Sequence, residues 1–149
     1  MKTVLVVEDH VDAAESLRVI LELEGFVPLV AFDGKSALHL LCDIRPDVVV
    51  SDVELPGMSG AEFCSVLRAH PSYAHLPVVV ITALDETQTR KLFTCFDAHL
   101  RKPIDPEALV ELLHGMIDKP LDPGRPSSRH AWPVDRFCAE ARKFLEHRG

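Results

Sequence analysis

The stretch VLVVEDHVD, residues 4–12, joins apolar, mostly β-branched side chains directly to a group of acidic ones. Residues 4–7 lack the apolar–polar alternation of a half-buried strand, which favours a strand buried on both faces of a parallel sheet. Glu8 and Asp9 follow at once, so two carboxylates are expected at the carboxyl end of this strand. That position matters, because open α/β sheets place their functional crevice beyond the carboxyl ends of the strands.

Strand-like and helix-like patterns alternate along the rest of the chain. Pro28 has no N–H to donate, which predicts that the second strand lies at an edge of the sheet. Strict alternation of strands and helices predicts an α/β fold, a doubly wound parallel sheet with helices on both faces. The expected strands are 3–8, 26–31, 46–52, 76–83 and 95–100, and the expected helices are 12–24, 34–44, 59–69, 85–93 and one that begins at 105.

The composition is that of an ordinary soluble protein, with 149 residues, 47% of them apolar and 26% charged. No apolar run approaches the ~20 residues of a membrane span, and Glu8 comes too early for a signal peptide, so a cytoplasmic protein is expected. The cysteines are scattered and are expected to be small core residues rather than disulfide partners or zinc ligands. They are Cys42, Cys64, Cys95 and Cys138.

Charge is distributed unevenly. Residues 1–118 carry 9 Lys and Arg against 19 Asp and Glu, whereas residues 119–149 carry 7 against 4. An acidic body argues against nucleic acid as the main partner, because phosphate binding needs a positive surface.

Five groups with related chemistry stand at predicted strand ends: Glu8, Asp9, Asp52, Thr82 and Lys102. Each alone is commonly a helix cap or a solvated side chain. Together, three carboxylates at one rim repel one another, and a divalent cation with a preference for oxygen ligands, such as Mg²⁺, relieves that repulsion. A carboxylate beside a cation can accept a phosphoryl group, whose charge a lysine and a hydroxyl donor then stabilise.

The segments VLVVED, PDVVVSDVELPGMSG, PVVVITA and LRKP make the chain resemble the receiver domain of two-component response regulators, over residues 1–118. The resemblance implies the flavodoxin-like receiver fold, a five-stranded sheet of order 2-1-3-4-5. It implies that Asp52 is the phosphoacceptor and that Mg²⁺ is held by Glu8, Asp9, Asp52 and the backbone carbonyl of Glu54. It also implies that Thr82 is the switch hydroxyl, that Lys102 pairs with the phosphoryl group, and that the Lys102–Pro103 bond is cis.

Some residues depart from the family pattern. His99 stands where the family usually has Phe or Tyr as a switch residue, so its coupling to Thr82 is expected to differ. Glu54 and Leu84, two residues beyond Asp52 and Thr82, are expected to alter the lifetime of the phosphoryl group. His10 is not expected to bind metal.

The last part of the chain differs in composition. Residues 119–133 are rich in Pro and Ser and predict a linker, and residues 134–149 predict an amphipathic helix. A helix this short is marginal alone, so it is expected to dock on the acidic body or on a partner. At about thirty residues, this part is not expected to form a DNA-binding output domain.

Three functions remain open. The first is a receiver, not an enzyme, that takes a phosphoryl group from a histidine kinase or a phosphotransfer protein. Its response would pass through the face formed by the predicted helix 85–93, strand 95–100 and last helix, which could also support a homodimer. The second is a binding module that is not phosphorylated. The third is an aspartate-nucleophile phosphohydrolase, for which Glu54 has the spacing but the surrounding pattern and a cap domain are missing.

Overall fold

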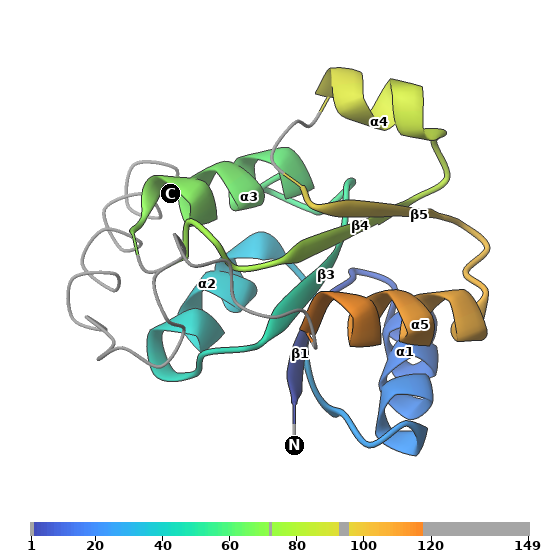
Figure 1. Ribbon diagram of the computed structural model, residues 1–149. Coiled ribbons are helices and arrows are strands. Elements are labelled where there is room, and N and C mark those ends of the chain that lie inside the picture. Colours follow the sequence, from blue (N-terminus) through green and yellow to red (C-terminus); the bar gives the residue numbers. More distant parts are fainter. Residues whose placement is uncertain (1, 72, 93–95, 118–149) are drawn as a thin grey trace.

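The computed structural model describes residues 2–71, 73–92 and 96–117, in which strands and helices alternate strictly (Figure 1). The order of elements is the predicted one, and most boundaries lie within about two residues of those expected. The strands are β1 Thr3–Val7, β2 Val27–Ala31, β3 Val48–Asp52, β4 Val78–Thr82 and β5 Ala98–Arg101. The helices are α1 Val11–Leu23, α2 Gly34–Asp43, α3 Gly60–Ala69, α4 Glu86–Leu92 and α5 Pro106–Ile117.

All strand pairs are parallel, and the order β2-β1-β3-β4-β5 confirms the predicted fold. β2 lies at an edge, where the missing N–H of Pro28 is tolerated. Every residue of β3 and β4 is buried, which matches the unbroken apolar runs of their sequences. Because all of these strands are parallel, their carboxyl ends lie at the same edge of the sheet, which we call the rim.

Successive residues of β1 supply two different cores. Leu5 and Val7 pack on the face covered by α2 and α3, whereas Val4 and Val6 pack on the face covered by α1 and α5. Figure 1 shows α1 and α5 next to each other. Because both faces are covered, both sets of side chains must be apolar, which explains the absence of alternation in residues 4–7.

β5 begins later than predicted, at Ala98 instead of residue 95. The residue before it is Asp97. Its side-chain carboxylate accepts a backbone N–H of the neighbouring strand β4, a role that a backbone carbonyl has in regular strand pairing. Asp97 Oδ2 accepts the Val78 N–H at 2.8 Å and an Arg68 Nη2 hydrogen at 2.7 Å. A polar side chain that takes over a backbone partner ends regular pairing, and the apolar pattern alone could not reveal this.

Other predictions have mixed outcomes. Cys64 is buried in the core on the α2–α3 side, as expected, Cys42 is half-buried and packs against that core, and Cys95 and Cys138 lie outside the described residues. The predicted linker 119–133 and helix 134–149 also lie outside them. Within the part of the chain that the structure describes, no helix is long and apolar enough to cross a bilayer.

The two helices that follow the site-bearing strands β3 and β4 both begin with side-chain caps. Ser59 Oγ accepts the Glu62 N–H at 3.1 Å at the start of α3. Asp85 Oδ1 accepts the Gln88 N–H at 2.8 Å, and Gln88 Oε1 accepts the Asp85 N–H at 3.3 Å, at the start of α4. These caps fix where the loops from β3 and β4 enter the next helices.

We expect Ser59→Ala to lower the free energy of unfolding by about 1 kcal/mol, because an N–H at the start of α3 loses its acceptor. Ser65→Ala, at an exposed position within the same helix, is the matched control. It should leave stability unchanged or slightly higher, since alanine favours helix interiors. Urea unfolding of both variants measures the difference, and equal stabilities would contradict the capping role.

Candidate functional site at the carboxyl ends of the strands

Strand register brings the predicted site residues together. Val7 lies beside Ser51, so the next residues along these strands, Glu8 and Asp52, are neighbours at the rim. Thr82 is the last residue of β4 and pairs with Arg101, which places Lys102 one step further out. The Lys102 N–H donates to the Thr82 carbonyl at 2.8 Å.

Lys102 joins two buried carboxylates. Its Nζ lies 2.8 Å from Asp52 Oδ2 and 3.3 Å from Glu8 Oε2. Glu8 is 1% exposed and Asp52 is 7% exposed, whereas the Lys102 side chain is half-buried. The bond between Lys102 and Pro103 is cis, as the family resemblance implies. One ammonium therefore serves two carboxylates that have little access to water.

The surroundings of this cluster raise the pKa values of both Glu8 and Lys102. Burial, followed by the negative charge of Asp52, raises the pKa of Glu8 above its ordinary value. Burial alone would lower the pKa of Lys102, but hydrogen bonds and charge attraction from Asp52 and Glu8 outweigh it and raise that pKa. Both shifts favour the protonated form, so the positive charge of Lys102 is stabilised and the ionised form of Glu8 is more costly than it would be in water.

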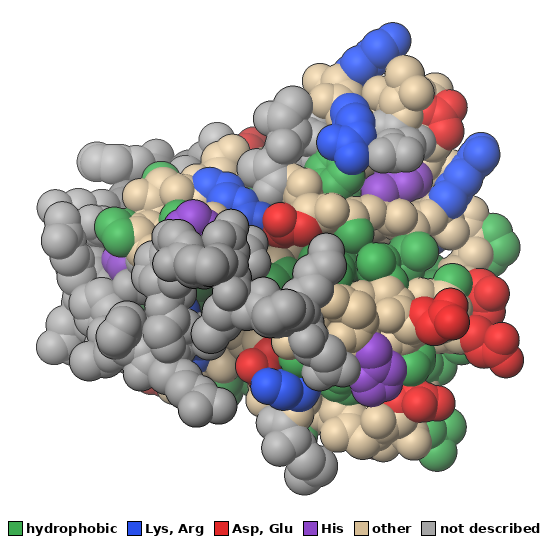
Figure 2. All heavy atoms as spheres, viewed as in Figure 1, with side chains coloured by type: hydrophobic (Ala, Val, Ile, Leu, Met, Phe, Trp, Pro, Cys, Tyr) green, Lys and Arg blue, Asp and Glu red, His purple; other side chains and the backbone are tan. Residues whose placement is uncertain are grey.

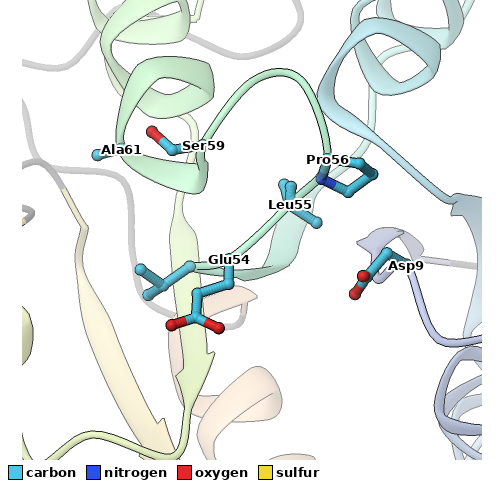
Figure 3. A pocket seen from close by; sticks show the side chains of 7 residues that line it. Asp9, Glu54, Leu55, Pro56, Ser59 and Ala61 are labelled. Atoms are coloured by element: carbon cyan, nitrogen blue, oxygen red, sulfur yellow. The ribbon is translucent and has the colours of Figure 1, made fainter.

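Asp9 stands beside this pair on the solvent side. Oxygen or nitrogen atoms of Glu8, Asp9 and His10 all lie within 4.8 Å of one another, and Glu8 Oε1 accepts the His10 N–H at 3.2 Å. Asp9 and His10 are exposed. Figure 3 shows Asp9 across an open pocket from the loop that follows β3, with Glu54, Leu55 and Pro56 on the other side.

The loops around Asp52 and Thr82 are held by short-range hydrogen bonds. Glu54 N–H donates to Asp52 Oδ1 at 3.3 Å, which orients the second carboxylate oxygen. Thr82 is buried, and its Oγ1 accepts the Leu84 N–H at 3.2 Å. The structure thus joins Glu8, Asp52 and Lys102 by direct contacts and places Asp9 and Thr82 at the same rim.

Gly60, which no sequence motif indicated, lies against the backbone of Asp52. A Cβ atom on Gly60 would collide with the carbonyl oxygen of Asp52 and lie 3.0 Å from the Val53 Cα. Ser51 Oγ also donates to that Asp52 carbonyl, at 2.9 Å. A glycine directly after the N-cap Ser59 could have indicated such a close backbone approach, since glycine is otherwise unfavourable in a helix.

Comparison with known proteins gives a consistent result. The profile of the response regulator receiver domain matches residues 4–114. The DNA-binding response regulator MtrA of Mycobacterium tuberculosis is 39% identical over 109 residues, which cover 72% of this chain and 46% of MtrA. The chain therefore spans about half the length of such relatives.

Solved structures agree. A putative response regulator from Chloroflexus aurantiacus superposes with a TM-score of 0.75 and 31% identity, covering 79% of this chain and 98% of that one. The receiver domain of the sensor histidine kinase PA1611 from Pseudomonas aeruginosa, solved with magnesium in its active site cleft, has the same fold with a TM-score of 0.74. It is 23% identical and covers 79% of this chain and 98% of its own. The chain belongs to the response regulator receiver domain family.

We expect Gly60→Ala to lower the free energy of unfolding by about 2 kcal/mol, because the backbone of Asp52 must shift to admit the methyl group. Gly115→Ala is the matched control, since a Cβ there meets nothing within 4 Å and the residue lies in α5. It should raise stability by about 0.5–1 kcal/mol. Unfolding in denaturant measures both changes. A Gly60→Ala variant as stable as the wild type would contradict the close approach of residue 60 to the Asp52 backbone.

We expect Glu8→Gln to raise the free energy of unfolding at pH 7 in the presence of EDTA. The folded-state pKa of Glu8 is raised, so its ionised form opposes folding at neutral pH. The gain should shrink as the pH falls through that raised pKa, because wild-type Glu8 then takes up a proton. Exposed Glu111→Gln should show neither effect. A Glu8→Gln variant less stable than the wild type at pH 7 would contradict the view that burial of the Glu8 carboxylate opposes folding.

Proposed function

We propose that this receiver domain accepts a phosphoryl group on Asp52 in a magnesium-dependent reaction and signals through the resulting change. The observation that carries the proposal is the contact of 2.8 Å between Lys102 Nζ and Asp52 Oδ2, with Glu8 and Asp9 beside it. A buried carboxylate that is paired with a cation and lies at the rim of an α/β sheet is suited to act as a nucleophile.

The donor set fits a divalent cation. Glu8, Asp9 and Asp52 bring three carboxyl groups to this rim, and Lys102 places one ammonium against two of them. Mg²⁺ prefers oxygen ligands, keeps several waters and takes one or two carboxylates directly. Asp9, Asp52 and the backbone carbonyl of Glu54 would hold it, with Glu8 acting through water. When bound, the ion neutralises charge on the phosphoryl oxygens.

The residues of the chain have distinct tasks in this reaction. A carboxylate oxygen of Asp52 forms the new bond to phosphorus, while the bond between phosphorus and the donor's imidazole nitrogen breaks and the electron pair stays with that nitrogen. The ammonium of Lys102 moves its hydrogen bonds from Asp52 to a phosphoryl oxygen. The Thr82 hydroxyl donates its proton in a hydrogen bond to another phosphoryl oxygen.

A histidine kinase or a histidine phosphotransfer protein would be the donor, in keeping with the family, and the response would pass through the face of α4, β5 and α5. That face is also where a homodimer would form. Glu54 supports a phosphoacceptor over a phosphohydrolase, since its side chain is exposed, whereas Asp52 is buried. The protein would then be no enzyme toward external substrates, and a cytoplasmic location follows from a kinase donor.

The proposal is tested by incubating the purified chain with acetyl phosphate and recording its intact mass. We expect the mass to increase by one phosphoryl group with Mg²⁺ but not with EDTA, and the adduct to be removed by hydroxylamine. Asp52→Asn should abolish the increase, because the amide is not a nucleophile, and Asp43→Asn, at the end of α2, should not.

An adduct that persists in Asp52→Asn would contradict the assignment of Asp52. The binding module would be favoured if the wild-type chain gained no phosphoryl group from acetyl phosphate or from a phosphorylated histidine phosphotransfer protein. Steady release of phosphate from free phosphomonoesters would instead favour the phosphohydrolase.

A further inference from the structure

Helix α1 exposes large apolar side chains along one line. Val11 is 60% exposed, Val19 is 45% exposed and Leu23 is 80% exposed. Together with Glu15 they recur every four residues, and such positions form a ridge on the surface of a helix. We call these four residues the α1 ridge. The residues of α1 that are buried in the core lie on another side of the helix, so the ridge is available to a further binding partner.

The α1 ridge lies in an acidic part of the surface. Helix α1 and the residue after it carry four acidic side chains: Asp12, Glu15, Glu22 and Glu24. The basic residue of this helix, Arg18, is shared by two of them, with Nη2 2.6 Å from Glu15 Oε2 and Nη1 2.8 Å from Glu22 Oε1. Figure 2 shows acidic and hydrophobic side chains together at the lower right, over α1 and the start of α5. A ligand that fits this ridge is therefore apolar and carries positive charge.

The chain itself contains a segment with this chemistry, residues 134–149, which lie outside the described part of the structure. Apolar residues recur in it at helical spacing: Val134, Phe137, Cys138, Ala141, Phe144 and Leu145. Basic residues exceed acidic ones from residue 119 to the end of the chain, with 7 Lys and Arg against 4 Asp and Glu. A helix this short is marginal alone and needs an apolar surface to pack on.

The described chain ends near the α1 ridge. Helix α5 ends at Ile117, and His114 in its last turn stacks on Phe26 with ring centroids 5.1 Å apart. Phe26 follows Leu23, the last residue of α1, by three positions. The chain therefore leaves α5 at the end of the molecule where α1 also ends. Residues 118–133 would span about 20 Å as a random coil, which is close to the length of α1, about 20 Å.

We propose that residues 134–149 bind the α1 ridge of the same chain, as a helix whose apolar residues cover Val19 and Leu23 and whose positive charge faces the surrounding acids. A second copy fits the ridge less well through its own α1, because two acidic surfaces would then face each other. Helix α1 begins two residues after Asp9, so a segment bound along it also restricts the access of other proteins to that side of the rim. This inference does not depend on the phosphorylation of Asp52.

Hydrogen exchange of the full chain, followed by mass spectrometry, tests the proposal. We expect the amides of residues 137–148 to exchange at least about tenfold more slowly than in a synthetic peptide of residues 134–149, because a docked helix is protected and an isolated one is marginal. The slow exchange should persist when the protein is diluted about tenfold, since binding within one chain does not depend on concentration.

Substitutions in the α1 ridge test which surface is bound. Val19→Gln/Leu23→Gln removes apolar area from the ridge and should return residues 137–148 to the exchange rate of the peptide. Both positions are exposed, and unchanged exchange of β3 and β4 in the same experiment shows that the variant is folded. Phe32→Gln is the matched control, because it removes an exposed apolar side chain that lies beside α2 instead. It should leave the exchange slow.

A second pair of substitutions leaves residues 2–117 unchanged. Phe137→Gln/Phe144→Gln should speed the exchange of residues 137–148 to that of the peptide, because the segment loses its apolar contacts. Glutamine favours a helix more than phenylalanine does, so faster exchange in this variant reports lost docking rather than lost helix propensity.

Exchange as fast in the wild type as in the peptide would overturn the inference. So would exchange that stays slow in Val19→Gln/Leu23→Gln or in Phe137→Gln/Phe144→Gln. Protection that disappears on dilution would assign the surface to a second copy, and loss of protection in Phe32→Gln would place the segment beside α2. Both of these results contradict binding to the α1 ridge of the same chain.

Discussion

The contact of Lys102 with Asp52 and Glu8 is the constraint on which the rest of the site depends. The sheet places the buried carboxylates of Glu8 and Asp52 at its rim, and the ammonium of Lys102 forms an ion pair with each of them. Burying charge in this way opposes folding, as the raised pKa of Glu8 indicates. Packing of apolar side chains on both faces of the sheet offsets this cost and fixes the positions of the strand ends that carry the cluster.

The same contact links three loops that are far apart in the sequence. Lys102 comes from the end of β5, Asp52 from β3 and Glu8 from β1, so a change in charge at Asp52 is felt at all three. The loop after β4 joins through Thr82, whose carbonyl accepts the Lys102 N–H. A phosphoryl group at this point would redistribute hydrogen bonds toward α4 and β5, which is how a local event can alter a distant surface.

Much of this could be predicted from the sequence. The order of elements, the edge position of β2, the caps at Ser59 and Asp85 and the rim of acidic residues all follow from local patterns. Such patterns carry no information about where a backbone passes close to another, as at Gly60, or which carbonyl a side chain will find. The contacts of His99 and Arg101 with the carbonyl oxygens of residues 84 and 83 span 15 and 18 positions and depend on loop geometry.

The central claim is that the nucleophile is Asp52. Borohydride reduction of the phosphorylated protein converts an aspartyl phosphate to homoserine, which peptide mass spectrometry locates. We expect homoserine at position 52 alone, and only after phosphorylation in Mg²⁺. Homoserine at Asp9 or another acidic residue, or none in protein that carries a phosphoryl group, would contradict it.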